Sequence, residues 1–491
     1  MTRKLRIAFV SAEVSPFAKT GGLGDVAGAL PRQLGVHGHD VVVFTPWYRQ
    51  TREYFEAAGV QPETLASLMI IWPGFSAPVT LLRSTLPGSG VPVIFVANDA
   101  LFDRDGIYAL RDGIYDDLLE RFTFFCRAVI AACETLGFSP DILHANDWHT
   151  ALLPIMLANG LRHSPHFAHC ASVFTIHNLN YQGRYGAEHF PGTGLPFSLW
   201  SPAAVEYFGD LNLMKGAIIF ADRVTAVSPN YAKEIQTPPF GAGLDGILRE
   251  HASKLVGILN GIDVEEWNPE TDRYIPARFS TESLAGKADC RRELRKEAGL
   301  QPRPRTPVIG IISRLVEQKG FDLLLPEIPR LLSLGAQFVV LGSGASFIEE
   351  AFRSFERDFS AQFRTWITFD LGLSHRIIAG SDLLLMPSHY EPCGLNQMYA
   401  LRYGTLPIVR LTGGLADTVL PFDGSNRRIA NGFGFGRPDA EMLFLISWIA
   451  MLSWKDEALR RTLQRNGMSA DFSWDHSARE YERVYRSTIG A

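Results

Sequence analysis

The sequence predicts two doubly wound α/β domains, each built on a mainly parallel sheet. At 491 residues, the chain is longer than one hydrophobic core usually serves. Short apolar and β-branched runs alternate with helix-length segments, a pattern typical of parallel sheets covered by helices on both faces. Two series of such runs indicate two domains. The runs are RIAFVSAE, DVVVFTP, VPVIFVAN, DILHAND, SVFTIHN and RVTAVSP in the N-terminal half, and KLVGILNG, PVIGIISR, QFVVLGSG, DLLLMPS and LPIVRLT in the C-terminal half.

The boundary between the two domains is expected near residue 250. A helical stretch at 246–251 precedes a new strand at 254–259, and no long Gly/Ser linker is present. We therefore expect an N-terminal domain over residues 1–250 and a C-terminal domain over residues 251–472, joined by a short hinge.

The C-terminal residues 473–491 are expected to form a helix. Trp474, Tyr481 and Tyr485 recur there at roughly helical spacing, which is typical of a helix with one buried face. We expect this helix to pack back on the N-terminal domain.

Composition and charge favour an ordinary globular protein over several other classes. Apolar residues make up 46% of the chain and charged residues 20%, as in ordinary globular proteins. The net charge of −5 argues against a nucleic-acid-binding protein, whose surface would be basic. Five cysteines without CxxC spacing favour a reducing cytoplasm over a disulfide or zinc framework. With no signal peptide, and with its longest apolar stretch (442–452) too short to span a bilayer, the chain is expected to be cytoplasmic and to have no membrane partner.

Small and polar residues follow almost every predicted strand. In open α/β sheets, ligands bind at the edge where the strands have their carboxyl ends. Turns favour the same residue types, but their recurrence after eleven strands favours a functional edge in each domain. These strand ends include Asn146-Asp147, His177-Asn178, Ser228-Pro229, Asn260-Gly261, Ser313-Arg314 and Gly342-Ser343-Gly344.

The segment Lys19–Asp25, KTGGLGD, is a candidate anion site. Glycines such as Gly21 and Gly22 let the backbone approach a ligand closely, and the start of the following helix offers free N–H groups. Lys19 adds a positive charge. The spacing is not GxGxxG, so a nicotinamide dinucleotide is not indicated, and a plain tight turn is the alternative. A similar segment, Thr412–Asp417, follows a later strand and suggests two Rossmann-like halves.

Two further loops carry candidate chemistry in the C-terminal half. Arg314 and Lys319 follow one strand and could bind a diphosphate, or form a solvated surface pair. Glu391 follows another strand and could bind sugar hydroxyls or face an oxocarbenium ion, or merely cap a helix. Pro392 is expected in the first turn of that helix. The amides of Cys393, Gly394 and Leu395 would then face a ligand.

Histidine, aspartate and aromatic residues in the N-terminal half suit a carbohydrate site. The segments 144–149 and 175–178 both end strands, and Trp148 and Tyr181 could offer ring faces to sugars. A single histidine at a strand end is usually structural. The cluster His163, His166, His169 and Cys170 lacks a carboxylate and is interrupted by Pro165. We therefore expect no metal site and no cofactor.

Six motifs together resemble the bacterial glycogen synthase and plant starch synthase family. KTGGLGDV, HANDWH, TIHN, SRLVEQKG, EPCGLNQ and RYGTLPIVRLTGGLADTV occur in family order. The resemblance covers the chain from about residue 6 to about residue 480. It implies the GT-B fold, in which two Rossmann-like, doubly wound domains face each other across a deep cleft. It further implies a retaining hexosyltransferase that moves glucose from ADP-glucose to the non-reducing end of an α-1,4-glucan such as glycogen.

The resemblance also implies roles for individual residues. Lys19, with Gly21, Gly22 and Asn260, would bind the donor, and Arg314 and Lys319 would bind its phosphates. Glu391 and Cys393 would be the active-site glutamate and cysteine, and Asp147 and His177 would line the sugar site. Cys393, Gly394 and Leu395 would also bind the donor. The catalytic set is then Glu391, His177, Asp147, Arg314 and Lys319. The segment 368–373 departs from many bacterial members, which carry a Tyr and a Glu there, and looks more like the plant form.

Two other functions stay open at this point. One is another retaining GT-B glycosyltransferase with a small sugar acceptor, of the sucrose or trehalose type. The other is a non-catalytic glucan-binding scaffold, which the intact set of Lys19, Arg314, Lys319 and Glu391 disfavours. A phosphorylase is disfavoured because no convincing pyridoxal-phosphate lysine motif is present.

Overall fold

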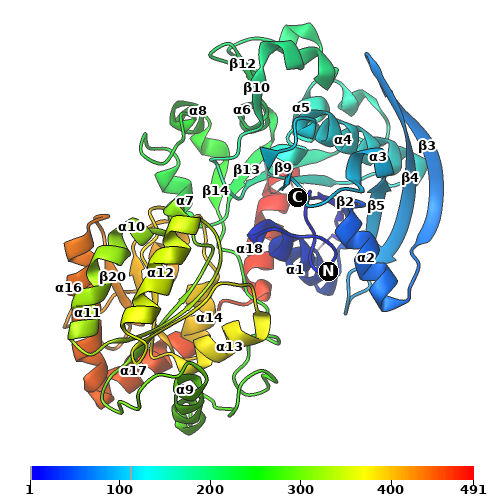
Figure 1. Cartoon of the computed structure of the whole chain (residues 1–491). Coiled ribbons are helices and arrows are strands. Elements are labelled where there is room, and N and C mark those ends of the chain that lie inside the picture. The colour runs from blue at the N-terminus through cyan, green and yellow to red at the C-terminus, as the bar shows by residue number, and fades with distance from the viewer. Residues whose placement is uncertain (1–2, 111–112, 491) are drawn as a thin grey trace. The chain divides into compact units, whose positions relative to one another are not determined.

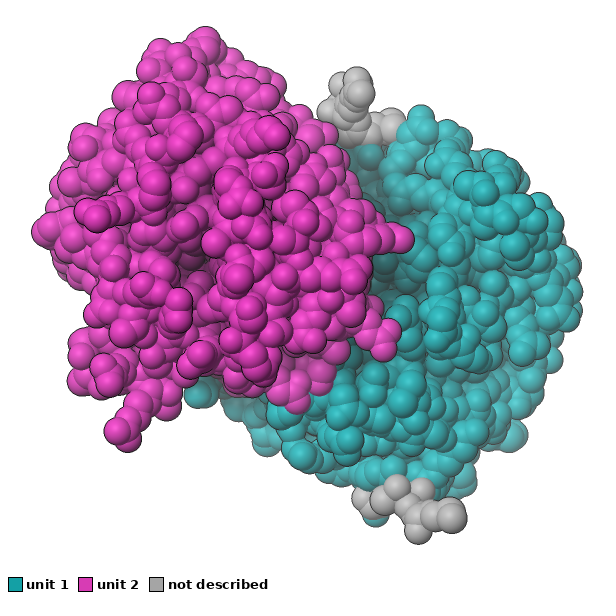
Figure 2. Space-filling model, turned by 90° about the horizontal axis from the view of Figure 1, so that it is seen from below, with its two compact units in different colours: residues 1–227, 232–261, 474–491 teal, residues 228–231, 262–473 magenta. Residues whose placement is uncertain are grey.

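A computed structural model describes residues 3–110 and 113–490 of the chain. They divide into two compact units, shown in different colours in Figure 2. The first unit contains the residues up to Val227, Ala232–Gly261 and the residues from Trp474 onward. The second contains Ser228–Tyr231 and Ile262–Ser473.

The first unit is built on a sheet that has nine strands among the described residues, in the order β14-β13-β9-β8-β1-β2-β5-β4-β3 (Figure 1). All neighbouring strands from β14 to β5 are parallel, whereas β3 and β4 form an antiparallel hairpin at one edge. The strands span Arg6–Val10 (β1), Asp40–Pro46 (β2), Glu63–Trp72 (β3), Phe75–Thr85 (β4), Pro92–Ala97 (β5), Ile142–Asn146 (β8), Ala171–Ile176 (β9), Arg223–Ala226 (β13) and Leu255–Gly257 (β14).

Helices cover both faces of this sheet. One hydrophobic cluster joins α1, α2 and α18 to β1, β2, β5 and β9. On the other face, α4 packs against β2 and β5, and α5 packs against β8 and β9. The helices of the unit are α1 (Gly22–Val36), α2 (Arg49–Ala58), α3 (Asp99–Phe102), α4 (Leu118–Thr135), α5 (Leu152–Ala158), α6 (Leu213–Phe220), α8 (Asp245–Glu250) and α18 (Trp474–Ile489), and α7 (Pro229–Glu234) begins in the second unit.

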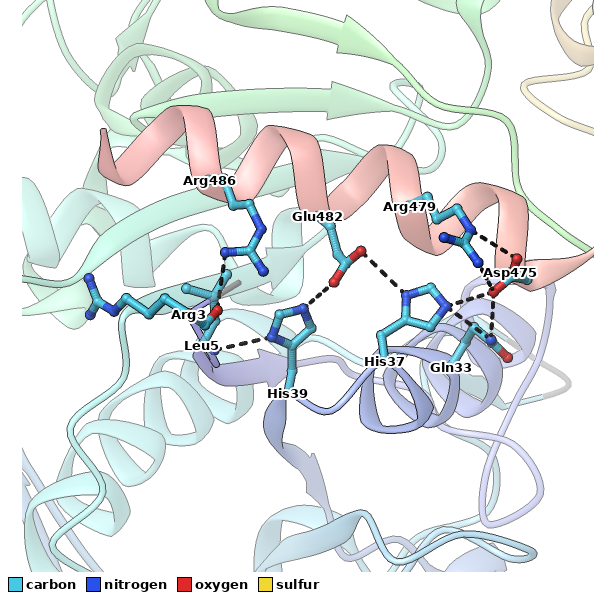
Figure 3. A network of polar contacts seen from close by, with 9 residues as sticks. All are labelled: Arg3, Leu5, Gln33, His37, His39, Asp475, Arg479, Glu482 and Arg486. Carbon is cyan, nitrogen blue, oxygen red and sulfur yellow. Dashed lines mark hydrogen bonds and ion pairs between the residues drawn. The ribbon is translucent and has the colours of Figure 1, made fainter. Parts of the chain in front are cut away.

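Helix α18 lies along α1 in the first unit (Figure 1). Trp474, Tyr481 and Tyr485 are buried in the core cluster of that unit, so the aromatic spacing seen in the sequence marks the buried face of this helix. Figure 3 shows the polar contacts beside it. His37 Nε2 lies 2.7 Å from Asp475 Oδ1, and His39, which accepts the N–H of Leu5, is bonded to Glu482.

The first unit extends past residue 250, where we expected it to end. Strand β14 pairs in parallel with β13, with Leu255 opposite Val224 and Gly257 opposite Ala226. The run we assigned to the C-terminal domain is therefore the last strand of the first sheet, and the unit continues to Gly261. A strand of three residues carries too little pattern to show which sheet it joins.

The second unit contains a sheet of six strands, all parallel, within the part of the chain that the structure describes. Their order is β17-β16-β15-β18-β19-β20. The strands span Val308–Ile312 (β15), Gln337–Leu341 (β16), Phe363–Trp366 (β17), Leu383–Met386 (β18), Leu406–Arg410 (β19) and Phe433–Phe435 (β20).

Two groups of helices pack on the second sheet. The larger hydrophobic cluster joins α10, α11, α12 and α16 to β15, β16 and β18. Other clusters bring α9, α13, α14 and α15 onto the sheet, and α17 packs on α14. The helices are α9 (Ala285–Glu297), α10 (Phe321–Leu324), α11 (Ile328–Ser333), α12 (Ser346–Asp358), α13 (Leu371–Gly380), α14 (Asn396–Arg402), α15 (Gly413–Thr418), α16 (Ala440–Lys455) and α17 (Glu457–Met468).

Both sheets are doubly wound, as the sequence predicts. In the first sheet, β1 and β8 are neighbours, and the strands that follow each of them in the chain are added on opposite sides of this pair. In the second sheet, β15 and β18 form the corresponding pair. Such switch points open a crevice at the carboxyl ends of the strands, where ligands bind in this class of fold. None of the described helices combines the length and apolar character needed to cross a lipid bilayer.

Candidate functional site

The loop after β1 places Lys19, Gly21 and Gly22 at the switch point of the first unit. Gly21 precedes α1, which begins at Gly22. A Cβ added at either glycine would meet no atom within 4 Å, so the backbone is open on this side. The Lys19 Nζ lies 2.6 Å from Asp25 Oδ1 in the first turn of α1. A cation therefore stands beside an accessible helix N-terminus, which suits an anionic ligand.

Asp147 and His177 meet at the carboxyl ends of β8 and β9. Asp147 Oδ1 accepts the backbone N–H of His177 at 2.8 Å, and His177 Nε2 donates to Asn146 Oδ1 at 2.9 Å. Asp147 has φ 56°, a conformation that is costly for a non-glycine residue and is found mostly at functional sites. The structure thus brings two of the expected site residues into one hydrogen-bonded group.

Burial changes the titration of this pair in opposite directions. It raises the pKa of Asp147 to about 7, although the backbone N–H groups of His177 and Asn178 oppose the change. It lowers the pKa of His177 to about 3. The imidazole is therefore neutral near pH 7, whereas burial favours the protonated form of Asp147.

Other candidates of the first unit are more deeply buried than expected. His144 is bonded to the Tyr485 hydroxyl at 2.7 Å and to Thr175 Oγ1 at 2.6 Å, and it is a structural residue of the α18 contact. Trp148 is 6% exposed and leaves little ring surface for a sugar, contrary to expectation, whereas Tyr181 is 57% exposed. Asn260 is buried after β14 in the first unit, not in the C-terminal domain where we expected it.

The switch point of the second unit brings Lys319 and Glu391 together. Lys319 ends a short 3₁₀ helix, Glu317–Lys319, after β15, and Glu391 follows β18. Lys319 Nζ lies 2.5 Å from Glu391 Oε2, and the Ser388 hydroxyl donates to the same oxygen at 3.2 Å. The two charged side chains are 16% and 9% exposed. Arg314, also after β15, is exposed and pairs with no acidic side chain in the described part of the chain.

The two loops that carry Lys319 and Glu391 are fixed to each other. Gln318 accepts the N–H of His389 at 2.9 Å through its carbonyl, and its side-chain amide donates to Tyr390 O at 3.2 Å. Gly320 has φ 73°, and a Cβ there would lie 2.0 Å from Pro387 O. Only glycine can therefore occupy this position without moving the neighbouring loop.

Arg410 is a further residue of this site that the sequence analysis missed. It is 5% exposed, and its Nε donates to Ser388 O at 2.7 Å while its Nη2 donates to His389 O. Its guanidinium thus holds the two residues that precede Tyr390 and Glu391. The available signal was a charged residue at the end of the apolar strand β19.

The second GG segment, Gly413-Gly414, packs against a neighbouring loop, unlike Gly21-Gly22. Gly413 has φ 46°, and a Cβ there would lie 2.0 Å from Glu391 O. At Gly414 the Cβ would lie 2.1 Å from Cys393 O. These glycines let α15 pack directly on the loop of Glu391, so they shape the site without being open to a ligand.

The helix after Glu391 begins later than expected. We predicted Pro392 in its first turn, but α14 begins at Asn396. Gly394 has φ 71°, which is incompatible with a right-handed helix. Cys393, Gly394 and Leu395 therefore belong to the loop, and their carbonyl side is engaged by Gln397, which donates to Cys393 O and Gly394 O.

The segment 368–373 begins α13. Asp370 accepts the N–H of Leu373 at 2.8 Å and so caps the helix, while Phe369 is 85% exposed. This segment therefore presents an exposed aromatic side chain at the start of α13.

Comparison with known proteins identifies the family. A family model described as the starch synthase catalytic domain matches residues 6–250, and one described as glycosyl transferases group 1 matches residues 306–441. A glycogen synthase from Anaeromyxobacter sp. (strain Fw109-5) is 45% identical over 98% of this chain and 99% of its own. One from Thermotoga maritima is 43% identical over 99% of both chains. The chain belongs to the glycogen and starch synthase family.

Solved structures of this family and fold agree with the assignment. The catalytic domain of starch synthase IV from Arabidopsis thaliana, bound to ADP and acarbose, is similar over the whole of both chains, with a TM-score of 0.89 and 35% identity. Sucrose-phosphate synthase from Thermosynechococcus elongatus, with a TM-score of 0.61 and 17% identity over 99% of this chain and 100% of its own, shares the fold alone. The chain therefore has the GT-B fold and is a glycosyltransferase of a family that uses a nucleotide-sugar donor and a glucan acceptor.

Proposed function

We propose that this protein is a glycogen synthase that transfers glucose from ADP-glucose to the non-reducing end of an α-1,4-glucan with retention of configuration. The observation that carries the proposal is the Lys319–Glu391 pair at the second switch point, in a chain 45% identical to a glycogen synthase over nearly its whole length. The choice of ADP is supported by the similar starch synthase structure, which is bound to ADP.

Two cations of the second unit would bind the diphosphate of the donor. The exposed guanidinium of Arg314 can bind two phosphate oxygens at once. Lys319 follows in the same loop region, after β15, and its ammonium group is a compact positive charge. A cation 4 Å from a phosphate oxygen contributes about 4 kcal/mol at the effective dielectric of a protein surface. This attraction grows as negative charge develops on the departing ADP, so it favours the transition state over the bound donor.

The ion pair favours an electrostatic role for Glu391. One of its oxygens is held by Lys319 and the Ser388 hydroxyl, and a carboxylate so engaged is a weak nucleophile. We infer that it stabilises positive charge on the glucose ring as the bond to ADP breaks. The acceptor 4-hydroxyl then attacks from the face that ADP leaves, and an oxygen of the departing phosphate takes its proton.

We assign substrate-binding roles to residues of the first unit as well. Lys19 and the start of α1 would bind phosphate, and Asp147 and His177 would bind hydroxyls of the reacting sugars. The neutral imidazole of His177 donates its Nε2–H to Asn146, so Nδ1 is left as an acceptor for a hydroxyl and adds no charge. All five cysteines are buried thiols outside any disulfide, which fits our proposal that the enzyme works in the cytoplasm.

A panel of donors tests the function. Glucose-labelled ADP-glucose, UDP-glucose and GDP-glucose are each supplied with glycogen, and label in the polymer is measured. We expect the largest kcat/KM with ADP-glucose. Parallel reactions with glucose or fructose phosphate as acceptor should yield no product. Transfer to these small acceptors alone would identify a different glycosyltransferase, and glycogen binding without transfer from any donor would identify a scaffold.

A further inference from the structure

A buried carboxylate lies beneath the loop of Lys19. Glu13 is 3% exposed and belongs to the segment between β1 and α1. Its Oε2 accepts the backbone N–H groups of Thr20 at 2.6 Å and Gly21 at 3.2 Å. Its Oε1 accepts the Thr20 hydroxyl at 2.9 Å. One side chain therefore holds both residues that follow Lys19.

A tyrosine holds this carboxylate in turn. The Tyr108 hydroxyl donates to Glu13 Oε1 at 2.7 Å, and its ring stacks on His149 with the centroids 4.8 Å apart. Burial, and to a smaller extent the charge of Glu13, raises the pKa of Tyr108 well above its usual value, so the phenol keeps its proton. Four donors then converge on two oxygens, an arrangement that only an acceptor without its own proton can satisfy.

Side-chain packing does little to define the shape of the loop at its glycines. No side chain of the described residues packs where a Cβ at Gly21 or Gly22 would point, and Gly21 provides no side-chain cap for α1. Glycine backbones are intrinsically free to adopt many conformations. The hydrogen bonds that Glu13 accepts therefore help to fix the backbone of Thr20 and Gly21 in one of them. Because Oε2 also occupies the Gly21 N–H, the amides open to a ligand begin at Gly22, at the first turn of α1.

We propose that Glu13 is a positioning residue for donor binding. It holds Thr20 and Gly21 so that Lys19 and the first amides of α1 face the donor's diphosphate together, and it acts through this loop without touching the donor. The proposal rests on the proposed function, because it takes the ligand of the Lys19 loop to be a nucleoside diphosphate sugar.

The Glu13→Gln variant tests the proposal. The amide keeps one acceptor oxygen and introduces an N–H₂ group, so it cannot accept all four donors. Loss of hydrogen bonds to a charged group should raise the donor KM about tenfold or more and lower kcat. The glycogen KM should stay within about twofold, because no contact of Glu13 with the acceptor is needed. A general loss of structure would instead lower the active fraction without separating the two KM values.

A double-mutant cycle with Lys19→Ala supplies the decisive readout. If Glu13 works by placing Lys19, then Glu13→Gln should cost little more once Lys19 has been removed, so the two effects should not add. Thr20→Val, which removes only the hydroxyl donor, should shift the donor KM in the same direction by a smaller factor, and it replaces Glu13→Gln in the cycle if that variant does not fold.

Asp222→Asn is the matched control. Asp222 accepts the N–H of Ser172 at 2.7 Å and its hydroxyl at 3.0 Å, both at Oδ2, which also pairs with Arg162. Like Glu13 with Thr20, it thus holds both the backbone N–H and the hydroxyl of one residue. Asp222 lies in the same unit, just before β13 and beside the first residues of β9. It is therefore at the amino ends of the strands, whereas Glu13 is at their carboxyl ends. We expect Asp222→Asn to lower the melting temperature and to leave the donor KM unchanged.

The outcomes separate the two proposals. Wild-type kinetics for Glu13→Gln, or full additivity with Lys19→Ala, overturns the positioning role and leaves the proposed function intact. If the wild-type protein transfers glucose from no donor, the proposed function fails instead. The role of Glu13 is then decided by equilibrium binding of ADP, which Glu13→Gln should weaken about tenfold and Asp222→Asn should not. Equal binding by all three proteins overturns it.

Discussion

Lys319 and Glu391 face each other at the switch point of the second sheet, with 2.5 Å between Nζ and Oε2. They come from the loops that follow β15 and β18, which are neighbouring parallel strands. Both side chains are largely shielded from water, so removal of either one leaves the other charge without its partner in a poorly solvated place. This relationship makes the pair sensitive to single substitutions.

Lys319→Ala should lower kcat about a hundredfold or more and raise the donor KM, because a charge that stabilises the leaving group is lost. Steady-state kinetics with ADP-glucose and glycogen measure both constants. Lys296→Ala is the control, since Lys296 is exposed and 3.9 Å from Glu293, and it should behave as wild type. Unchanged kinetics for Lys319→Ala would remove this residue from the proposed mechanism.

Glu391 should not become covalently glucosylated. Its Oε2 is engaged by Lys319 and Ser388, and the mechanism proposed above needs no enzyme-bound sugar. Mass spectrometry of the protein incubated with donor in the absence of acceptor should find no hexose on the peptide containing Glu391. A glucosyl adduct there would establish a two-step mechanism in which this carboxylate is the nucleophile.

Arg410→Lys should damage both stability and turnover. A lysine has no planar fork of donors and cannot bond Ser388 O and His389 O as Arg410 does. We expect a loss of about 2 kcal/mol in the free energy of unfolding and a fall in kcat of about tenfold, as the loop of Glu391 loosens. Urea denaturation and steady-state kinetics measure these effects. Arg357→Lys, at an exposed ion pair with Glu350, should change neither.

The first unit should lose stability in acid because it buries neutral histidines. Burial lowers the pKa values of His144, His149 and His177 to about 3, whereas an unfolded histidine titrates near 6.5. The unfolded chain therefore binds more protons between these values, so the stability present above about pH 6.5 is lost as the pH falls from 6.5 towards 3. His144→Gln should make this dependence shallower in urea denaturation at several pH values. An unchanged slope would show that His144 does not contribute.

Asp147 should have the opposite effect on stability. Its pKa is raised to about 7 in the folded protein, above its unfolded value of about 3.9. The folded state therefore binds more protons between these values, and the contribution of Asp147 is full in acid and is lost as the pH rises through 7. Asp147→Asn removes this titration and keeps an oxygen for the His177 N–H. The difference in unfolding free energy between wild type and variant should change between pH 4 and pH 8; a constant difference would contradict the raised pKa.

Sequence reasoning placed its candidate residues in the loops that follow strands. Arg314, Lys319 and Glu391 lie in such loops, and the switch points of the two sheets are where such loops gather. Arg410 and Glu13 could not be found in this way, because their roles depend on loops that come close only after folding. The pattern of the chain shows which strand a residue ends, but not which carbonyl its side chain will reach.

The two GG segments show a second limit. The two segments have nearly the same residues and both begin helices, which is why the sequence suggests two Rossmann-like halves. In the structure, the space beside the Cα atoms of Gly21 and Gly22 is open, whereas the loop of Glu391 occupies that space at Gly413 and Gly414. The antiparallel hairpin of β3 and β4 was missed for a related reason, since its exposed residues hide the apolar pattern of a buried strand.

Helix α18 sets the order in which the units can be completed during synthesis. Its Trp474 and Tyr485 fill the core of the unit that starts the chain, yet a ribosome makes them after every residue of the second unit. The second unit can thus close while the nascent chain is still growing, whereas the first exposes part of its interior until α18 has been made. A stop codon between the second unit and α18 would therefore damage the unit that was begun first.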